Sequence, residues 1–164
     1  MPAREVVAQM RRAGLTLACA ESLTGGALVS AFVEVPGASA VVRGGIVAYA
    51  TDLKAELLGV DPGLLAASGP VDPVVAREMA DGVRVRLGAD VGLATTGVAG
   101  PGTQHGRPVG TVFVAVTTAR RAAVRPLRLA GTRDALRRAT VLSAIALLRG
   151  AVLEAGNNHD SSGV

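Results

Sequence analysis

The sequence predicts an α/β sandwich built on a largely parallel sheet. Short apolar runs typical of buried strands alternate along the chain with amphipathic helical segments, and polar or glycine-rich turns separate them. The 164 residues, of which 49% are hydrophobic, are enough to bury one core. Because no repeat and no long linker divides the chain, we expect a single domain.

Each element of this prediction has its own boundary signals. We expect helices over residues 2–14, 27–33, 51–59, 72–87 and 131–153, and strands over residues 15–20, 41–50, 90–96, 111–117 and 122–129. In the first helix, Val6, Val7 and Met10 share one face, and Gly14 ends it. The first strand is a short, mostly apolar run, typical of a buried strand.

Capping residues mark the two middle helices. Thr51 or Asp52 is expected to cap the short helix, which Gly59 ends. Asp72 and Pro73 supply an N-cap and a first-turn proline for the longer one.

The last third of the chain predicts a hairpin and a long helix. The strands at 111–117 and 122–129 are expected to pair antiparallel, with Arg120 and Arg121 at their turn. The long helix opens at 131–134. We expect the domain to span residues 1–155 and the polar tail, 156–164, to be disordered.

Composition excludes several functional classes. With 2% aromatic residues, the chain lacks the stacking platform of single-stranded nucleic-acid binders. The only cysteine, Cys19, excludes an intramolecular disulfide and a cysteine-rich metal site. Two histidines, His105 and His159, leave little for a metal, and we expect neither a metal nor a cofactor.

The sequence carries no targeting or membrane signal. Charged residues interrupt the N-terminal region where a secretory peptide has an apolar core. No apolar run approaches the roughly 18 residues of a membrane span. We therefore expect a cytoplasmic protein without a membrane partner.

Lysine and tyrosine each occur once. The formal charge is +4, and sixteen of the seventeen basic residues are arginine, which leaves Lys54 as the only lysine. Coding bias explains heavy arginine use most simply, but a buried lysine can lose its proton and an arginine cannot. Tyr49, the only tyrosine, lies five residues away. Both residues are therefore candidate site residues.

Ser22 follows the first predicted strand, and Thr24, Gly25 and Gly26 open the next helix. Ligands bind at the C-terminal ends of strands in open α/β folds. Free N–H groups at a helix start attract a phosphate or the oxyanion of acyl transfer. The alternative is that Ser22 and Thr24 only cap the helix while the glycines permit close packing.

A second glycine-rich strand exit covers residues 95–102. If its strand is parallel to the first, Thr96, Gly97 and Gly100 lie at the same sheet edge as Ser22. Two such exits in one small domain favour a ligand cleft. The alternative is a flexible connection.

Arginine is concentrated near the C-terminus. Eight of the sixteen arginines fall between residues 120 and 149, against one acid, Asp134. Arg133, Arg137 and Arg138 stand about one turn apart on the last helix. This pattern fits a phosphate-bearing ligand or a nucleic acid, or alternatively a solvated helix face.

A serine nucleophile needs a base. Neither histidine is placed convincingly, which leaves Lys54 as the candidate if burial lowers its pKa toward neutrality. A spacing of 32 residues cannot by itself show contact.

Several motifs together resemble the CinA C-terminal domain family, in collinear order over roughly residues 5–154. They are the segments 20–26 (AESLTGG), 44–49 (GGIVAY), Lys54 with 57–60 (LLGV), 68–71 (SGPV), 96–102 (TGVAGPG), 107–112 (RPVGTV) and 131–137 (GTRDALR). The resemblance implies a three-layer α/β/α sandwich with a mixed, mostly parallel sheet, usually in a homodimer.

The resemblance also implies an activity. Members of the family hydrolyse the carboxamide of nicotinamide mononucleotide to nicotinate mononucleotide and ammonia, in pyridine-nucleotide salvage. The expected partner is this nucleotide, with no cofactor and no nucleic acid. The competing class is a non-catalytic nucleotide- or DNA-binding module linked to competence and DNA damage.

By position, Ser22 matches the family's nucleophile and Lys54 its catalytic lysine. Tyr49, Thr96 and Arg133 match further active-site positions. We expect substrate contacts at Thr24, Gly25, Gly26, Gly97, Gly100 and Arg137, with the N–H groups near Gly25 and Gly26 holding the oxyanion and Arg133 the phosphate.

The sequence departs from the family pattern at three places. Thr132 stands where an aspartate is usual, Arg107 replaces a lysine, and the loop 102–106 is short. These departures affect loop contacts and substrate preference and leave Ser22 and Lys54 in place.

Overall fold

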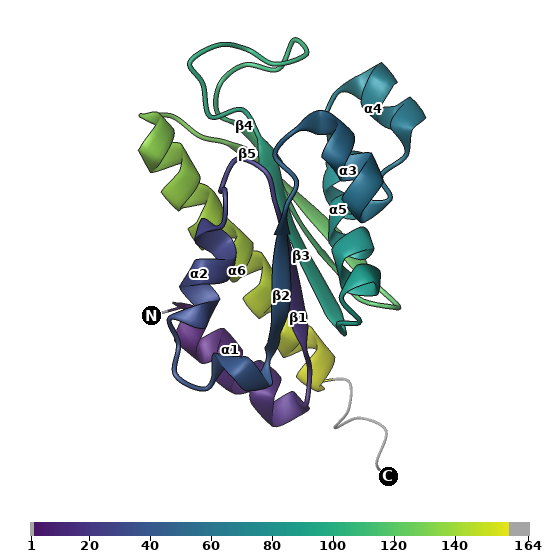
Figure 1. The fold of residues 1–164 in the computed structure, drawn as a ribbon. Helices are drawn as coiled ribbons and strands as arrows, with labels where there is room; N and C mark the ends of the chain where they lie inside the picture. Colours follow the sequence, from purple (N-terminus) through teal and green to yellow (C-terminus); the bar gives the residue numbers. More distant parts are fainter. Residues whose placement is uncertain (1, 158–164) are drawn as a thin grey trace.

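The sheet has five strands in the order β2-β1-β3-β4-β5, in a computed structural model that describes residues 2–157 (Figure 1). The strands are β1 (Leu17–Glu21), β2 (Val42–Val47), β3 (Val91–Gly97), β4 (Thr111–Thr117) and β5 (Ala122–Arg128). β1 pairs in parallel with β2 and β3, while β4 pairs antiparallel with β3 and β5. Only β4 therefore runs opposite to the other four, and the predicted mixed, mostly parallel sheet with a late hairpin is confirmed.

Helices cover both faces of this sheet (Figure 1). One layer holds α1 (Pro2–Ala13), α2 (Ala27–Val33) and α6 (Arg133–Asn157), and the other α3 (Thr51–Leu58), α4 (Pro62–Ser68) and α5 (Pro73–Arg86). A short 3-10 helix, η1 (Ala38–Ala40), precedes β2. The α/β/α sandwich is thus confirmed, in agreement with the amphipathic pattern of α1.

Alternation along the strands divides the interior into two cores. In β1, Leu17 and Cys19 face the core with α1 and α6, whereas Ala18 and Ala20 face the core with α5. The small side chains on the α5 face let that helix approach the sheet closely. A Cβ at Gly92 in β3 would lie 1.9 Å from the Ala80 carbonyl oxygen of α5.

Most element boundaries match the sequence prediction, but the end of β2 and the cap of α3 do not. β2 ends at Val47 rather than at residue 50, because the chain turns away there toward α3. The predicted cap at Thr51 or Asp52 is wrong, since both lie inside α3 and its N-cap, Ala50, has no side-chain cap. By contrast, Asp72 caps α5 as predicted, accepting from the N–H groups of residues 74 and 75.

The sequence prediction missed α4, although its start signal was present. Asp61 accepts a hydrogen bond from the Gly63 N–H, and Pro62 occupies the first turn, the same arrangement as at α5. α6 continues past the predicted end at residue 153 to Asn157. The rest of the predicted tail, 158–164, lies outside the described residues, and so does His159. No helix among the described residues is long and apolar enough to span a membrane.

We predict that Gly82→Ala destabilises the fold by about 2 kcal/mol or more, because overpacking of this kind forces backbone shifts. A Cβ at Gly82 in α5 would lie 1.8 Å from the Leu58 carbonyl oxygen, where α3 crosses. Gly150→Ala on α6 is the control, because no atom lies within 4 Å of its Cβ. This control should gain about 0.5–1 kcal/mol from helix propensity. Urea unfolding of both variants measures the difference, and an unchanged Gly82→Ala would contradict the close α3–α5 contact.

Candidate active site

Three strand ends bring the predicted site residues to one edge of the sheet. β1, β2 and β3 are parallel, so the residues that follow them lie together: Ser22 after β1, Tyr49 after β2 and the loop from Gly97 after β3. α3 begins just after Tyr49 and carries Lys54 back toward this edge. The prediction that both glycine-rich exits share an edge is confirmed.

A cavity of about 270 Å³ opens at this edge. Its lining comprises Ser22, Leu23, Tyr49, Lys54, Pro70, Val71, residues 96–100, residues 102–104 and Arg133. Five of the proposed catalytic residues (Ser22, Tyr49, Lys54, Thr96 and Arg133) therefore meet in one hollow, although they lie up to 111 positions apart in the chain.

The Lys54 amine lies against Ser22 at the floor of the cavity. Lys54 Nζ is 3.2 Å from Ser22 Oγ, 2.7 Å from the Ala48 carbonyl oxygen and 3.3 Å from the Tyr49 carbonyl oxygen. Only 1% of Lys54 is exposed, and Ser22 is also buried. The turn between β2 and α3 thus supplies two carbonyl acceptors for the amine, and the turn after β1 supplies the hydroxyl.

Burial makes this amine easier to deprotonate. Desolvation lowers the pKa of Lys54 from its ordinary value of 10.5 to about 8, against a smaller opposing effect of the Asp52 carboxylate. With a pKa of 8, about a tenth of the lysine is neutral at pH 7. The sequence hypothesis of a base-competent lysine beside Ser22 has both the contact and the electrostatics it requires.

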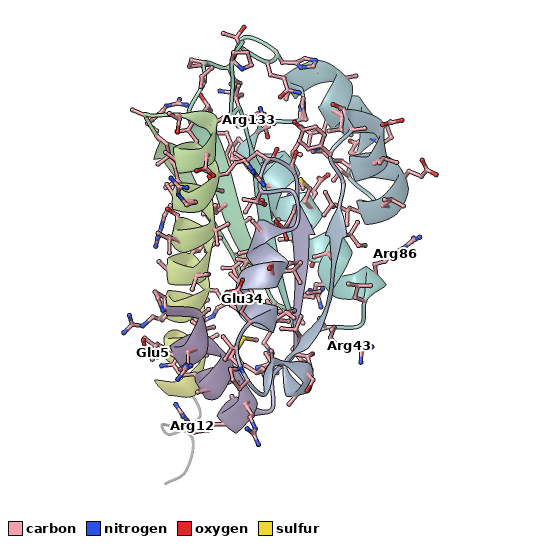
Figure 2. The ribbon with its side chains drawn as sticks, turned by 60° about the vertical axis from the view of Figure 1, so that its left-hand side comes forward. Glu5, Arg12, Glu34, Arg43, Arg86 and Arg133 are labelled. Atoms are coloured by element: carbon pink, nitrogen blue, oxygen red, sulfur yellow. The ribbon has the colours of Figure 1, made fainter. Side chains whose placement is uncertain are left out.

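Tyr49 and Arg133 form the rim of the cavity. Arg133 Nη1 donates to the Gly100 carbonyl oxygen at 2.7 Å, and Nη2 donates to the Tyr49 hydroxyl at 3.0 Å. The Tyr49 side chain is 60% exposed, and Arg133 is exposed as well. Figure 2 shows Arg133 at the upper end of α6, beside the loop that follows β3. A guanidinium at the mouth suits an anionic group on the substrate.

The loop after β3 forms one wall of the cavity. Thr96 is buried, and its hydroxyl donates to the Pro70 carbonyl oxygen at 2.7 Å, which ties β3 to the segment before α5. Farther along, Gln104 and Arg107 exchange two backbone hydrogen bonds. Arg107 also pairs with the α5 cap, Asp72, at 3.7 Å. The short loop is therefore an anchored wall, which argues against the alternative of a flexible connection.

Comparison with known proteins decides the family. Residues 2–152 match the family model described as CinA C-terminal domain. The chain belongs to this family.

Relatives and solved structures agree with this assignment. A CinA-like protein from Frankia casuarinae is 54% identical over 134 residues, which cover 82% of this chain and 31% of that protein. A putative competence-damage inducible protein from Caldanaerobacter subterraneus is 43% identical, over 88% of this chain and 35% of that protein. The CinA C-terminal domain described here therefore spans about a third of the length of these relatives.

Solved structures share the fold. The competence/damage inducible protein CihA from Agrobacterium tumefaciens superimposes with a TM-score of 0.88 at 36% identity, covering 91% of this chain and 92% of that one. A CinA superfamily protein from Klebsiella pneumoniae gives a TM-score of 0.90 at 29% identity, covering 93% and 96%. The names of these proteins state no reaction, so the chemistry must be argued from the site.

The site of this CinA domain departs from the sequence prediction at the start of α2. Glu21 is fully buried, and its carboxylate accepts from the N–H groups of Gly26, Leu28 and Val29 at 2.8–3.0 Å. The Gly25 N–H donates to the Ser22 carbonyl oxygen. The Gly25 and Gly26 amides themselves therefore already have acceptors, so an oxyanion donor predicted near these glycines must come from another N–H of the turn.

Thr24 and Arg137 also play other parts than predicted. The buried Thr24 hydroxyl bonds the Thr95 hydroxyl at 2.8 Å, linking the turn to β3. Arg137 donates from Nε to the Leu23 carbonyl oxygen at 3.0 Å and from Nη2 to the Thr24 carbonyl oxygen at 2.9 Å. Neither residue lines the cavity. Both residues hold the Ser22 turn in this structure, and substrate contacts at these two positions stay a prediction.

The arginine run does not form one patch. Arg128, Arg133, Arg137, Arg138 and Arg149 all have partners within the domain: Thr111, the cavity rim, the Ser22 turn, Asp134 and Glu5, respectively. Arg120 and Arg121 follow β4 at the end of the sheet opposite the cavity. In Figure 2, Arg12, Arg43 and Arg86 also lie far from Arg133. The clustered arginines thus make several separate contacts and lie at both ends of the sheet.

Several lining residues were not predicted as site residues, among them Leu23, Pro70, Val71, Thr103 and Gln104. Pro70 and Val71 form a buried wall, although their segment was quoted for the family resemblance. Thr103 and Gln104 line the cavity from the loop. Only the backbone pairing across the loop puts these two residues at the cavity, and a single sequence carries no signal for it.

The described residues contain no group of three or more His, Cys, Asp or Glu side chains arranged to hold a metal. Cys19 is fully buried in β1, and burial, with a smaller effect of Glu21, raises the pKa of its thiol. A protonated, buried thiol is a poor nucleophile. Ser22 is therefore the nucleophile candidate in this region.

Proposed function

We propose that this CinA domain hydrolyses the carboxamide of nicotinamide mononucleotide, releasing nicotinate mononucleotide and ammonia, with Ser22 as nucleophile and Lys54 as general base. The reaction class rests on the Ser22–Lys54 contact. The nucleotide rests on the family resemblance and on the guanidinium at the cavity mouth.

The observation that carries the proposal is the set of acceptors around Lys54 Nζ. A neutral amine has two N–H donors and one lone pair. The carbonyls of Ala48 and Tyr49 accept the two N–H groups, at 2.7 and 3.3 Å. The lone pair is then left for the Ser22 hydroxyl proton, 3.2 Å away. This is the arrangement that a serine–lysine nucleophile requires.

The reaction proceeds in two stages. Lys54 takes the Ser22 proton as Oγ attacks the carboxamide carbon, and the resulting ammonium returns a proton to the departing ammonia. The acyl ester on Ser22, still carrying the ribose phosphate, is then attacked by water, which gives its proton to Lys54. Collapse of this second intermediate releases the carboxylate and restores the Ser22 hydroxyl.

The other cavity residues bind and orient the substrate in this proposal. Tyr49 holds Lys54 through its carbonyl, while its hydroxyl is fixed by Arg133. The Thr96 hydroxyl donates to Pro70, so its lone pairs are available to the N–H groups of the carboxamide. Arg133, with Gly97 and Gly100 in the adjacent loop, is placed to contact the phosphate.

The alternative of a DNA-binding module finds less support. Such binding depends on several simultaneous phosphate contacts from Lys or Arg side chains. Five arginines of the run have partners inside the domain, and Arg120 and Arg121 lie at the opposite end of the sheet.

Assembly as a homodimer stays part of the proposal, and light scattering of the purified protein tests it.

We predict that Ser22→Ala and Lys54→Arg each lower kcat for ammonia release by roughly 10³-fold or more. Alanine removes the nucleophile, and arginine cannot become the neutral base. The assay is ammonia release from nicotinamide mononucleotide with EDTA present, with the melting temperature of each variant as a check on folding. Full activity of a folded Lys54→Arg protein would rule out the lysine base.

We predict a different effect for Arg133→Ala. Removing the guanidinium should raise KM for nicotinamide mononucleotide by about 10-fold or more, and change KM for nicotinamide riboside little, because only the first carries a phosphate. Arg138→Ala is the matched control, since Arg138 is exposed and pairs with Asp134 on the same helix. Equal effects of Arg133→Ala on both substrates would argue against a phosphate contact.

A further inference from the structure

The turn that carries Ser22 is held by groups from distant parts of the chain. The Ser22 N–H donates to the Thr95 carbonyl oxygen, and the Ser22 carbonyl oxygen accepts from the Gly25 N–H, both at 3.1 Å. The next two carbonyls, of Leu23 and Thr24, accept from the single guanidinium of Arg137. Arg137 reaches them from α6, 114 and 113 residues away in sequence.

These contacts fix the orientation of consecutive peptide groups. The only cis peptide bond in the described residues joins Gly100 and Pro101, so the peptides of the turn are trans. In a trans peptide the C=O and N–H point in opposite directions. Because the Leu23 carbonyl faces Arg137, the Thr24 N–H points away from Arg137. Because the Ser22 carbonyl faces Gly25, the Leu23 N–H points out of the turn.

Those two N–H groups have no acceptor within the described part of the chain. The backbone N–H groups of residues 22 and 25–29 around them all donate hydrogen bonds. Residue 22 donates to Thr95, residue 25 to Ser22, residue 27 to Thr24, and residues 26, 28 and 29 donate to Glu21. Leu23 lines the cavity. The N–H of the residue directly after a nucleophilic serine is the oxyanion donor in strand-to-helix turns of other hydrolases.

We infer that the Leu23 N–H, which lies at the cavity, is the oxyanion donor of the proposed reaction, and that Arg137 is the positioning residue that holds the turn carrying it. This inference rests on the proposed function, since it needs an acyl group on Ser22. The planar guanidinium suits the task, because two of its N–H donors reach neighbouring carbonyls at once, whereas a lysine ammonium offers a single point of attachment. Donors held in place before the reaction stabilise the developing charge without reorganising.

Geometry also explains why the inference falls on Arg137 rather than on its neighbour. Arg137 is half-buried, and a Cβ at Gly25 would lie 3.6 Å from its Nη2, so the guanidinium packs directly on the turn. Arg138 is exposed and pairs with Asp134 one helical turn away. Both side chains lie on α6, which makes Arg138→Ala the matched control for the loss of one arginine.

The test compares wild type, Arg137→Ala, Arg137→Lys and Arg138→Ala in two measurements. The first is kcat and KM for nicotinamide mononucleotide. The second is the Kd of 3-pyridylboronic acid, which forms a tetrahedral adduct on an activated serine and places an oxygen at the oxyanion position. The melting temperature of each variant checks folding.

We expect Arg137→Ala to lower kcat about 10- to 100-fold, to leave KM within about threefold of wild type, and to weaken boronate binding about 10-fold or more. Arg137→Lys should be intermediate, and Arg138→Ala should match wild type. If Arg137→Ala fails to fold, Arg137→Lys carries the test, and wild-type kcat in that variant overturns the inference.

Two further outcomes separate the inference from the proposed function. A rise in KM alone in Arg137→Ala would make Arg137 a substrate ligand and overturn the positioning role. Wild-type kcat together with wild-type boronate affinity in Arg137→Ala would also overturn the positioning role. These results leave an active wild type and so leave the proposed function intact. A folded wild type with neither turnover nor a boronate adduct on Ser22 overturns both proposals.

Discussion

Removal of the Lys54 amine from water is the constraint on which the candidate site depends. A buried ammonium is costly, and the domain offsets this cost with two carbonyl oxygens and the Ser22 hydroxyl rather than with a carboxylate in contact. A contacting carboxylate would strongly favour the charged ammonium, whereas neutral carbonyl oxygens favour it less and also accept from the neutral amine. Desolvation by burial lowers the pKa of Lys54, and the Asp52 carboxylate opposes this only in part.

The rest of the fold keeps these partners in register. Parallel pairing of β1 with β2 brings the Ser22 turn beside the Ala48–Tyr49 turn, and α3 returns Lys54 to the gap between them. Close approach of α5 to α3 and to β3, through Gly82 and Gly92, fixes the depth of α3 against the sheet. Glu21 satisfies the first N–H groups of α2 from inside the domain, so the helix that follows Ser22 stays anchored without a ligand.

The fold and part of the site could be predicted from the sequence, for identifiable physical reasons. Hydrophobic periodicity and caps such as Asp72 are local signals, so most elements were predictable. Ser22 and Lys54 were indicated by a strand end and by the single lysine, but their contact depends on the pairing of β1 with β2. The roles of Glu21 and Arg137 could not be predicted from the sequence. The role of Glu21 depends on the orientation of its buried carboxylate, and the role of Arg137 depends on a contact with a residue 114 positions away. The arginine run was hard to interpret for the same reason, because closeness in sequence does not show which arginines form contacts within the domain.

The central claim is that neutral Lys54 is the base for Ser22, and a matched pair of pH titrations tests it most directly. Because Lys54 is the only lysine, selective isotope labelling of lysine gives one side-chain NMR signal whose midpoint reports its pKa. The account predicts a midpoint near 8 and a kcat/KM for nicotinamide mononucleotide that rises with pH through the same midpoint, since the deprotonated form is the active one. A kcat/KM that stays flat while Lys54 titrates, or a Lys54 pKa at its ordinary 10.5, would contradict the account.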